Sequence, residues 1–115
     1  QGIIAKKEII NGISVFKLTG SDISPDVVKD IAFQLKGQFP EKMFFVAGTS
    51  MKGKANITVM LSDDLVKKGL HAGNLVRQAA KFIEGGGGGQ PHFATAGGKK
   101  VDGLSAAMQL ILKNL

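Results

Sequence analysis

The sequence of 115 residues is long enough for one domain with a buried core, and it has no cysteine for disulfides or thiolate metal sites. It has no apolar run near the length of a membrane span and no signal segment, so we expect no membrane contact and a cytoplasmic location. A net charge of +6 suits a polyanionic partner such as nucleic acid. Because the chain begins with Gln1, we expect it to be a piece excised from a longer protein.

The first third of the sequence predicts a β-hairpin followed by a helix. Residues 3–10 and 13–18 are apolar and β-branched, and Asn11-Gly12 between them favours a type I′ turn. Ser24-Pro25 is a typical helix start, apolar residues then recur at helical spacing, and Gly37 predicts the helix end. We expect this helix to cross over from the hairpin to the next strand.

The middle of the sequence predicts two more strands, which are joined by an exposed turn. Residues 43–47 and 55–61 are continuous apolar runs, typical of strands buried on both faces. The link over 48–54 is polar and contains glycine, so we expect a hairpin tip with Lys52 and Lys54 in solvent. The whole pattern predicts one α/β domain over residues 1–115. Its mixed sheet has four or more strands, with three to four helices packed on it.

Two further helices are predicted after the second apolar run. Ser62 is placed to cap a short helix, and Asp63 and Asp64 fall in its first turn, where acids complement the helix dipole. We therefore interpret these acids as structural and not as metal ligands or acid–base groups. Residues 72–84 form the clearest helical pattern, with one apolar side made of Leu75, Val76, Ala79, Ala80, Phe82 and Ile83.

A glycine-rich stretch over residues 85–100 follows this helix and is predicted to be a loop between packed elements. It begins with the five glycines Gly85, Gly86, Gly87, Gly88 and Gly89. Glycine loses much backbone entropy on ordering, so such a run favours close backbone contact or positive φ angles. A flexible linker is the alternative interpretation. Beyond it, Asp102 is placed to cap a last helix whose apolar face includes Leu104, Ala107, Met108, Ile111 and Leu115.

Known catalytic and cofactor motifs are absent from the sequence. Gly98-Lys99 lacks the upstream glycine of a phosphate-binding P-loop, and the glycine run follows a helix instead of preceding one, unlike a dinucleotide-binding fingerprint. His71 and His92 lack the spacing of a zinc site, and no nucleophile motif is present. We therefore expect no catalytic residue, no metal site and no enzyme activity in this fragment.

Cations and an aromatic ring around the glycine stretch suggest nucleic-acid binding. Arg77 and Lys81 share the polar side of the preceding helix, and Lys99 and Lys100 lie at the end of the stretch. If the stretch folds back on the helix, these four cations come together on one surface. The backbone of Gly97 and Gly98 with these two lysines, just before a helix, is placed to hold a phosphate; a solvated turn is the alternative. Lys67 and Lys68 are candidates to extend the surface.

Phe93 and the neighbouring His92 lie within the same stretch. The Phe93 ring has two interpretations: a platform on which an unpaired base stacks, or an anchor that pins the stretch to the core. The second is the commoner situation for phenylalanine.

One segment carries a family resemblance. Asn74-Leu75-Val76, the glycine run, Pro91 and Ala94-Thr95-Ala96-Gly97-Gly98 resemble the C-terminal domain of alanyl-tRNA synthetases, which is also found appended to DHH-type phosphoesterases. Gln90 and His92 depart from the usual basic and acidic residues of the synthetases.

The resemblance implies a tRNA-binding module that contacts the outer corner of tRNA, with alanine tRNA as the expected partner beside the upstream domains, and that assists aminoacylation and editing there. ATP and zinc are expected only in those upstream domains, and no cofactor is expected here. Two alternatives stay open: a nucleotide- or single-strand-binding domain of a DHH phosphoesterase, and a protein-interaction or dimerisation module.

Overall fold

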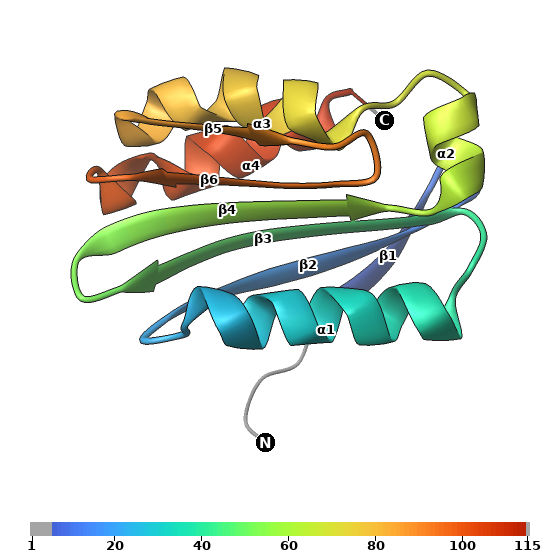
Figure 1. The fold of residues 1–115 in the computed structure, drawn as a ribbon, viewed down its shortest axis with the longest axis horizontal. Helices are drawn as coiled ribbons and strands as arrows, with labels where there is room; N and C mark the ends of the chain where they lie inside the picture. Colours follow the sequence, from blue (N-terminus) through green and yellow to red (C-terminus); the bar gives the residue numbers. More distant parts are fainter. Residues whose placement is uncertain (1–5, 115) are drawn as a thin grey trace.

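A computed structural model describes residues 6–114 as a mixed six-stranded sheet in the order β1-β2-β3-β4-β6-β5. Helix α1 covers one face of the sheet and helices α3 and α4 cover the other, with α2 at one end (Figure 1). The α/β prediction is therefore confirmed. The elements are β1 (Lys6–Ile10), β2 (Ile13–Ser21), α1 (Pro25–Gln38), β3 (Met43–Met51), β4 (Lys54–Leu61), α2 (Asp63–Lys67), α3 (Ala72–Ala79), the 3₁₀ helix η1 (Ala80–Ile83), β5 (Gly85–Gly89), β6 (Phe93–Gly98), the 3₁₀ helix η2 (Val101–Gly103) and α4 (Leu104–Leu112).

The first hairpin and its crossover helix are as the sequence predicts. Asn11 and Gly12 both have positive φ angles, 53° and 80°, as a type I′ turn requires. The Ser24 hydroxyl accepts a hydrogen bond from the backbone N–H of Val27, and α1 then carries the chain from β2 to the parallel strand β3. The helix passes through Gly37 and ends one residue later, so the predicted stop at that glycine was one residue early.

Strands β3 and β4 separate two apolar cores. The larger core lies between the sheet and helices α3 and α4 and contains Phe44, Ile57 and Ile111. The smaller core lies under α1 and contains Phe45 and Met60. Because both faces are covered, these central strands are almost continuously buried, which explains their uninterrupted apolar sequence.

The predicted helix over 72–84 is shorter than its pattern suggests. α3 ends at Ala79, and a 3₁₀ turn continues to Ile83, after which Glu84 is left-handed with φ 52°. The tighter 3₁₀ winding changes the phase of the side chains. Phe82 is therefore 42% exposed, although the helical pattern placed it on the buried side.

The glycine stretch is a β-hairpin, so its interpretation as a loop was wrong. β5 consists of the five glycines and pairs antiparallel with β6, which in turn pairs antiparallel with β4. Glycine has low strand propensity, so the paired strand β6 and the contacts with α3 impose the extended conformation. The linker interpretation also fails, because the stretch is part of the sheet.

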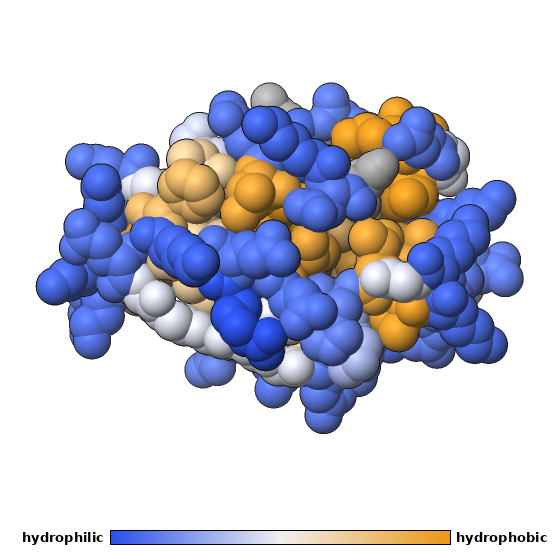
Figure 2. Space-filling view, turned by 90° about the horizontal axis from the view of Figure 1, so that it is seen from above, coloured by the Kyte–Doolittle hydropathy of each residue, from blue (hydrophilic) through white to orange (hydrophobic). Residues whose placement is uncertain are grey.

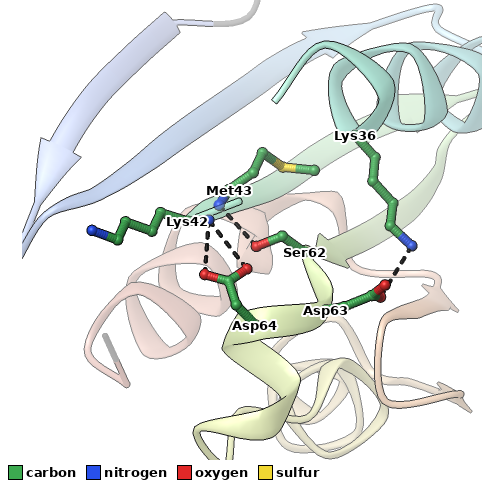
Figure 3. Close-up of polar contacts among 6 residues, drawn as sticks. All are labelled: Lys36, Lys42, Met43, Ser62, Asp63 and Asp64. Carbon is green, nitrogen blue, oxygen red and sulfur yellow. Dashed lines mark hydrogen bonds and ion pairs between the residues drawn. The ribbon is translucent and has the colours of Figure 1, made fainter. Parts of the chain in front are cut away.

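Side chains at the start of α2 connect this helix to the beginning of β3 and to α1 (Figure 3). Ser62 occupies the N-cap position, but its hydroxyl accepts a hydrogen bond from the N–H of Met43 and not from the helix, so the predicted cap was wrong. The Asp64 carboxylate accepts from the N–H of Lys42 at 3.0 and 3.2 Å. The Asp63 carboxylate lies 3.5 Å from the Lys36 ammonium.

The hydrogen bonds to Asp64 predict a specific pH dependence of stability. The pKa of Asp64 is lowered, mainly by the hydrogen bond with the Ser62 hydroxyl. Partial burial acts in the opposite direction, and the N–H of Lys42 lowers the pKa further. A carboxylate whose pKa is lower in the folded protein stabilises it above the unfolded pKa, and this contribution disappears as pH falls. Asp64→Asn should therefore lower the free energy of unfolding at pH 7, by less than about 1 kcal/mol because solvent screens the group. The difference in free energy of unfolding between this variant and the parent protein, measured by urea titration, should disappear below about pH 4.

Asp63→Asn is the matched control for this prediction, because its carboxylate is 80% exposed and pairs only with a flexible lysine. We expect a smaller loss from it at pH 7. A gap for Asp64→Asn that stays constant from pH 7 to pH 3 would contradict the assignment.

The last helix also begins differently from the prediction. Lys100 leads into η2, α4 begins at Leu104, and Asp102 makes no side-chain cap. Ala107, Met108 and Ile111 are buried as predicted, whereas the predicted Leu115 lies outside the described residues. The surface over α3 and α4 shows apolar patches bounded by hydrophilic side chains (Figure 2). No helix within residues 6–114 is long and apolar enough to cross a membrane.

Candidate nucleic-acid interface

The hairpin of β5 and β6, residues 85–98, is held by backbone contacts that only glycine permits; we call it the glycine hairpin. A Cβ on Gly87 would fall on the backbone of Ala96, and a Cβ on Gly98 would fall on the carbonyl oxygen of Ile83. At Gly86 the same atom would meet nothing within 4 Å. The run therefore combines positions where glycine is needed for close approach with positions that are open.

The predicted cations lie in the segments that lead into and out of the glycine hairpin. Lys99 and Lys100 follow directly after Gly98, which pairs with Gly85, and Lys81 lies in η1 just before that residue. These three lysines therefore belong to adjoining segments at the open end of the hairpin. Arg77 lies beside Gly88, three residues farther along β5 than Gly85.

Arg77 is oriented by contacts on both sides. Its Nη1 donates a hydrogen bond to the Asn74 side-chain oxygen at 2.9 Å. Its Nη2 lies 3.3 Å from the place that a Cβ on Gly88 would occupy, so the guanidinium packs against bare backbone. The remaining N–H groups of the guanidinium can still donate to a phosphate or a base edge.

His92 and Phe93 lie at the other end, near the turn that joins β5 to β6. The His92 carbonyl accepts a hydrogen bond from the N–H of Leu61, and its side chain is half-buried. The Phe93 ring packs on the core under α1, with its centroid 5.3 Å from that of Phe33. Phe93 therefore anchors the hairpin to the core, as the second interpretation predicted. The neighbouring Phe33 is 46% exposed.

The phosphate-binding turn predicted at residues 97–100 is not formed as expected. Gly97 and Gly98 are strand residues, and the N–H of Lys100 donates to the Ile83 carbonyl at 2.9 Å. Fewer backbone donors are therefore free than a phosphate-binding turn would offer. The lysine side chains remain exposed, and neither makes an ion pair within residues 6–114.

Two features here have no clear signal in the sequence. The ring nitrogen Nδ1 of His71 accepts a hydrogen bond from the N–H of Asn74 at 3.1 Å and so caps α3. The second feature is Lys54, which β4 brings beside Lys99 because Ala55 pairs with Gly98. Histidine is not among the usual N-cap residues, so the cap was not expected. The approach of Lys54 to Lys99 depends on the register of the sheet, which no local pattern reveals.

The chemistry of this surface is suited to binding a polyanion. No group of three or more His, Cys, Asp or Glu side chains that could hold a metal ion occurs among the described residues. Lysine binds phosphate as a point charge without reading sequence, and exposed glycine backbone allows close approach of a ligand. The surface can therefore bind a polyanion by its shape and charge.

Comparison with known proteins decides the family. The profile of the DHHA1 domain matches residues 11–115. The chain belongs to the DHHA1 domain family. This confirms the family that the glycine run and the Ala-Thr-Ala-Gly-Gly motif predicted.

Its sequence relatives in this family are alanine–tRNA ligases. That of Bacteroides thetaiotaomicron is 60% identical over 104 residues, which are 90% of this chain and 12% of the ligase. That of Porphyromonas gingivalis is 54% identical over 102 residues, 88% of this chain and 12% of the ligase. The chain thus spans about an eighth of the length of the curated relatives it matches.

Two solved structures share the fold of this DHHA1 domain. The C-Ala domain of Aquifex aeolicus alanyl-tRNA synthetase superimposes with a TM-score of 0.81 at 24% identity, covering 92% of this chain and 94% of that domain. A DHH domain described as a member of a family of ribosomal proteins superimposes with a TM-score of 0.70 at 16% identity. This match covers 96% of this chain and 27% of the other chain. At such identities the likenesses establish a shared fold.

Proposed function

We propose that this DHHA1 domain is the C-terminal tRNA-binding module of an alanyl-tRNA synthetase. The observation that carries the proposal is 60% identity to alanine–tRNA ligases over nine-tenths of the chain. The exposed cations along the glycine hairpin and the net charge of +6 supply the attraction for RNA that such a module needs.

The proposed contact is with the sugar–phosphate backbone at the outer corner of tRNA. Arg77 is the chain's one arginine, so lysines carry most of the positive charge and the domain should recognise shape instead of sequence. Arg77 is held against the glycine hairpin and can donate to a phosphate or base there. Upstream domains would distinguish the alanine tRNA from other tRNAs.

In this proposal the domain works in the cytoplasm as a part of a ligase and catalyses nothing alone. ATP and zinc would bind only to upstream domains, and this segment would need no cofactor. Its contribution is to hold one tRNA while aminoacylation and editing proceed elsewhere in the same chain. Holding the substrate raises the effective concentration of the tRNA at both centres.

Titration of the 115-residue chain with alanine tRNA at a series of salt concentrations tests the proposal. Four lysine or arginine contacts with phosphate predict a slope of log affinity against log salt of roughly −3, since each contact contributes about −0.7 to −0.9. An unrelated tRNA should bind with a similar slope. Absence of binding at about 50 mM salt, or binding without salt dependence, would favour a protein-interaction module instead.

A further inference from the structure

A cavity of about 470 Å³ lies between the first turn of α1, the β3–β4 turn and the end of β6. Its rim carries Lys52, Lys54 and Lys99, and no acidic residue lines it. We call it the lysine cavity. Its volume falls within the range of small-molecule sites, roughly 300 to 1,000 Å³.

The lysines of this cavity come from three places in the sheet and are available to a ligand. Lys52 lies in the β3–β4 turn with φ 53°, Lys54 begins β4, and Lys99 follows β6. All three side chains are exposed, and none takes part in an ion pair in the described part of the chain. Like charges brought together in this way repel unless an anion lies between them. The arrangement therefore favours a bound anion.

The floor of the lysine cavity is largely apolar. Met51 and Ala55 line it, although the Ala55 side chain itself is buried in the core under α3 and α4. Gly97 and Gly98 contribute bare backbone, and Pro25 begins α1 at the edge. A free phosphate needs no such floor, whereas a nucleobase gains from flat apolar contact on its face. The combination of an apolar floor and a cationic rim therefore matches a nucleotide better than inorganic phosphate.

Asn56 provides a polar group at the same floor. Its side-chain amide has one acceptor and two donor positions, and no side-chain hydrogen bond engages it in residues 6–114. Directly opposite on β3 lies Thr49, which is 1% exposed and whose hydroxyl has no hydrogen-bond partner among the described residues. An Asn56 amide next to an unsatisfied hydroxyl is free to reorient toward the edge of a base.

We propose that the lysine cavity holds one unpaired nucleotide of a bound RNA. The base would lie on the floor beside Asn56, and its phosphate would lie among Lys52, Lys54 and Lys99. The inference rests on the proposed function for the class of ligand, and it adds a defined site on the α1 side of the sheet. It also gives Lys52 and Lys54 a role beyond that of solvated turn residues.

Nuclear magnetic resonance of the ¹⁵N-labelled 115-residue chain tests this site with adenosine 5′-monophosphate as probe. We expect saturable shifts of the amides of Ala55, Asn56, Gly97 and Gly98, with a dissociation constant on the order of 1 mM for so small a ligand. Adenosine alone and inorganic phosphate alone should each bind at least about fivefold more weakly, since each lacks one half of the contacts. Equal binding of inorganic phosphate would overturn the nucleotide assignment.

Variants separate the site from general charge. The double variant Lys52→Gln/Lys54→Gln should weaken binding of the monophosphate about tenfold, through loss of charge-assisted hydrogen bonds. Lys113→Gln, an exposed lysine at the end of α4 on the opposite face, should leave it unchanged. If the double variant and the parent chain bind the monophosphate with equal affinity, the proposed site is wrong.

Titration of the parent chain with tRNA, beside the titration with the monophosphate, distinguishes this inference from the proposed function. If the monophosphate leaves the cavity amides unshifted while tRNA still binds with a steep salt slope, the nucleotide site is wrong and the tRNA-binding module stands. If tRNA does not bind either, both proposals fall. Amide spectra of each variant without ligand show whether it is folded.

Discussion

Gly98→Ala is expected to destabilise this domain strongly. The new Cβ would clash with the carbonyl oxygen of Ile83 and crowd that residue's side chain. β6 lies between β4 and β5, so Gly98 cannot move away without disturbing two strand pairings. Overpacking that cannot relax costs about 3 kcal/mol, and this should lower the melting temperature by roughly 10 °C.

The neighbouring Gly97 is the matched control. A Cβ there would meet its nearest atoms at 3.8 and 3.9 Å, which is ordinary contact. Gly97→Ala should therefore change the free energy of unfolding by less than about 0.5 kcal/mol. On β5, Gly86→Ala should be similarly mild because its position is open. Thermal and urea unfolding of the three variants provide the measurement. If Gly97→Ala and Gly98→Ala were equally stable, close backbone packing would not be the reason for glycine here.

Reversing the charge of Lys99 and Lys100 together is the second change for which we expect a large effect. Lys99→Glu/Lys100→Glu should weaken tRNA binding about tenfold or more in low salt, because it removes two phosphate contacts and adds repulsion. The slope of log affinity against log salt should become shallower by roughly 1.5, and alanine tRNA and unrelated tRNAs should be affected alike. Filter binding or fluorescence anisotropy across a salt series measures both quantities.

The control is a double reversal with the same change of net charge elsewhere. Lys29 is exposed on α1 and Lys113 is exposed at the end of α4, so Lys29→Glu/Lys113→Glu is matched in charge. Lys36 is a poorer choice, since it pairs with Asp63. Should the control lose as much affinity as the reversal of Lys99 and Lys100, the binding would depend on diffuse charge, and the localised surface would be wrong.

The sequence predicted elements well where local chemistry decides the backbone. Asn11-Gly12 specifies its turn, Ser24 specifies its cap, and the apolar run from Met43 predicts a central strand, because each signal acts over a few residues. The run of glycines gives no such signal, since a strand without side chains has neither alternation nor β-propensity. Its pairing with β6 decides its structure, and pairing between segments is a tertiary property.

Prediction of the candidate site was limited for a related reason. The motif identified the glycine stretch and the cations beside it, but it could not show that Phe93 would pack on the core or that Arg77 would lie against Gly88. The lysine cavity combines three segments, and Lys52 and Lys99 are far apart in sequence. Spacing within a motif cannot reveal such a site, because only the register of β3, β4 and β6 assembles it.

The all-glycine composition of β5 makes its order depend on its surroundings. Five glycines lose more backbone entropy on ordering than any other five residues, and they bury no side chains in return. β5 therefore stays extended only while β6 and α3 are in place beside it, so its amides should exchange with solvent through small local openings. A ligand that binds only the closed hairpin shifts this equilibrium by mass action. If RNA binds as proposed, its binding and closure of β5 would be thermodynamically linked. Adding RNA should then slow the hydrogen exchange of the β5 amides.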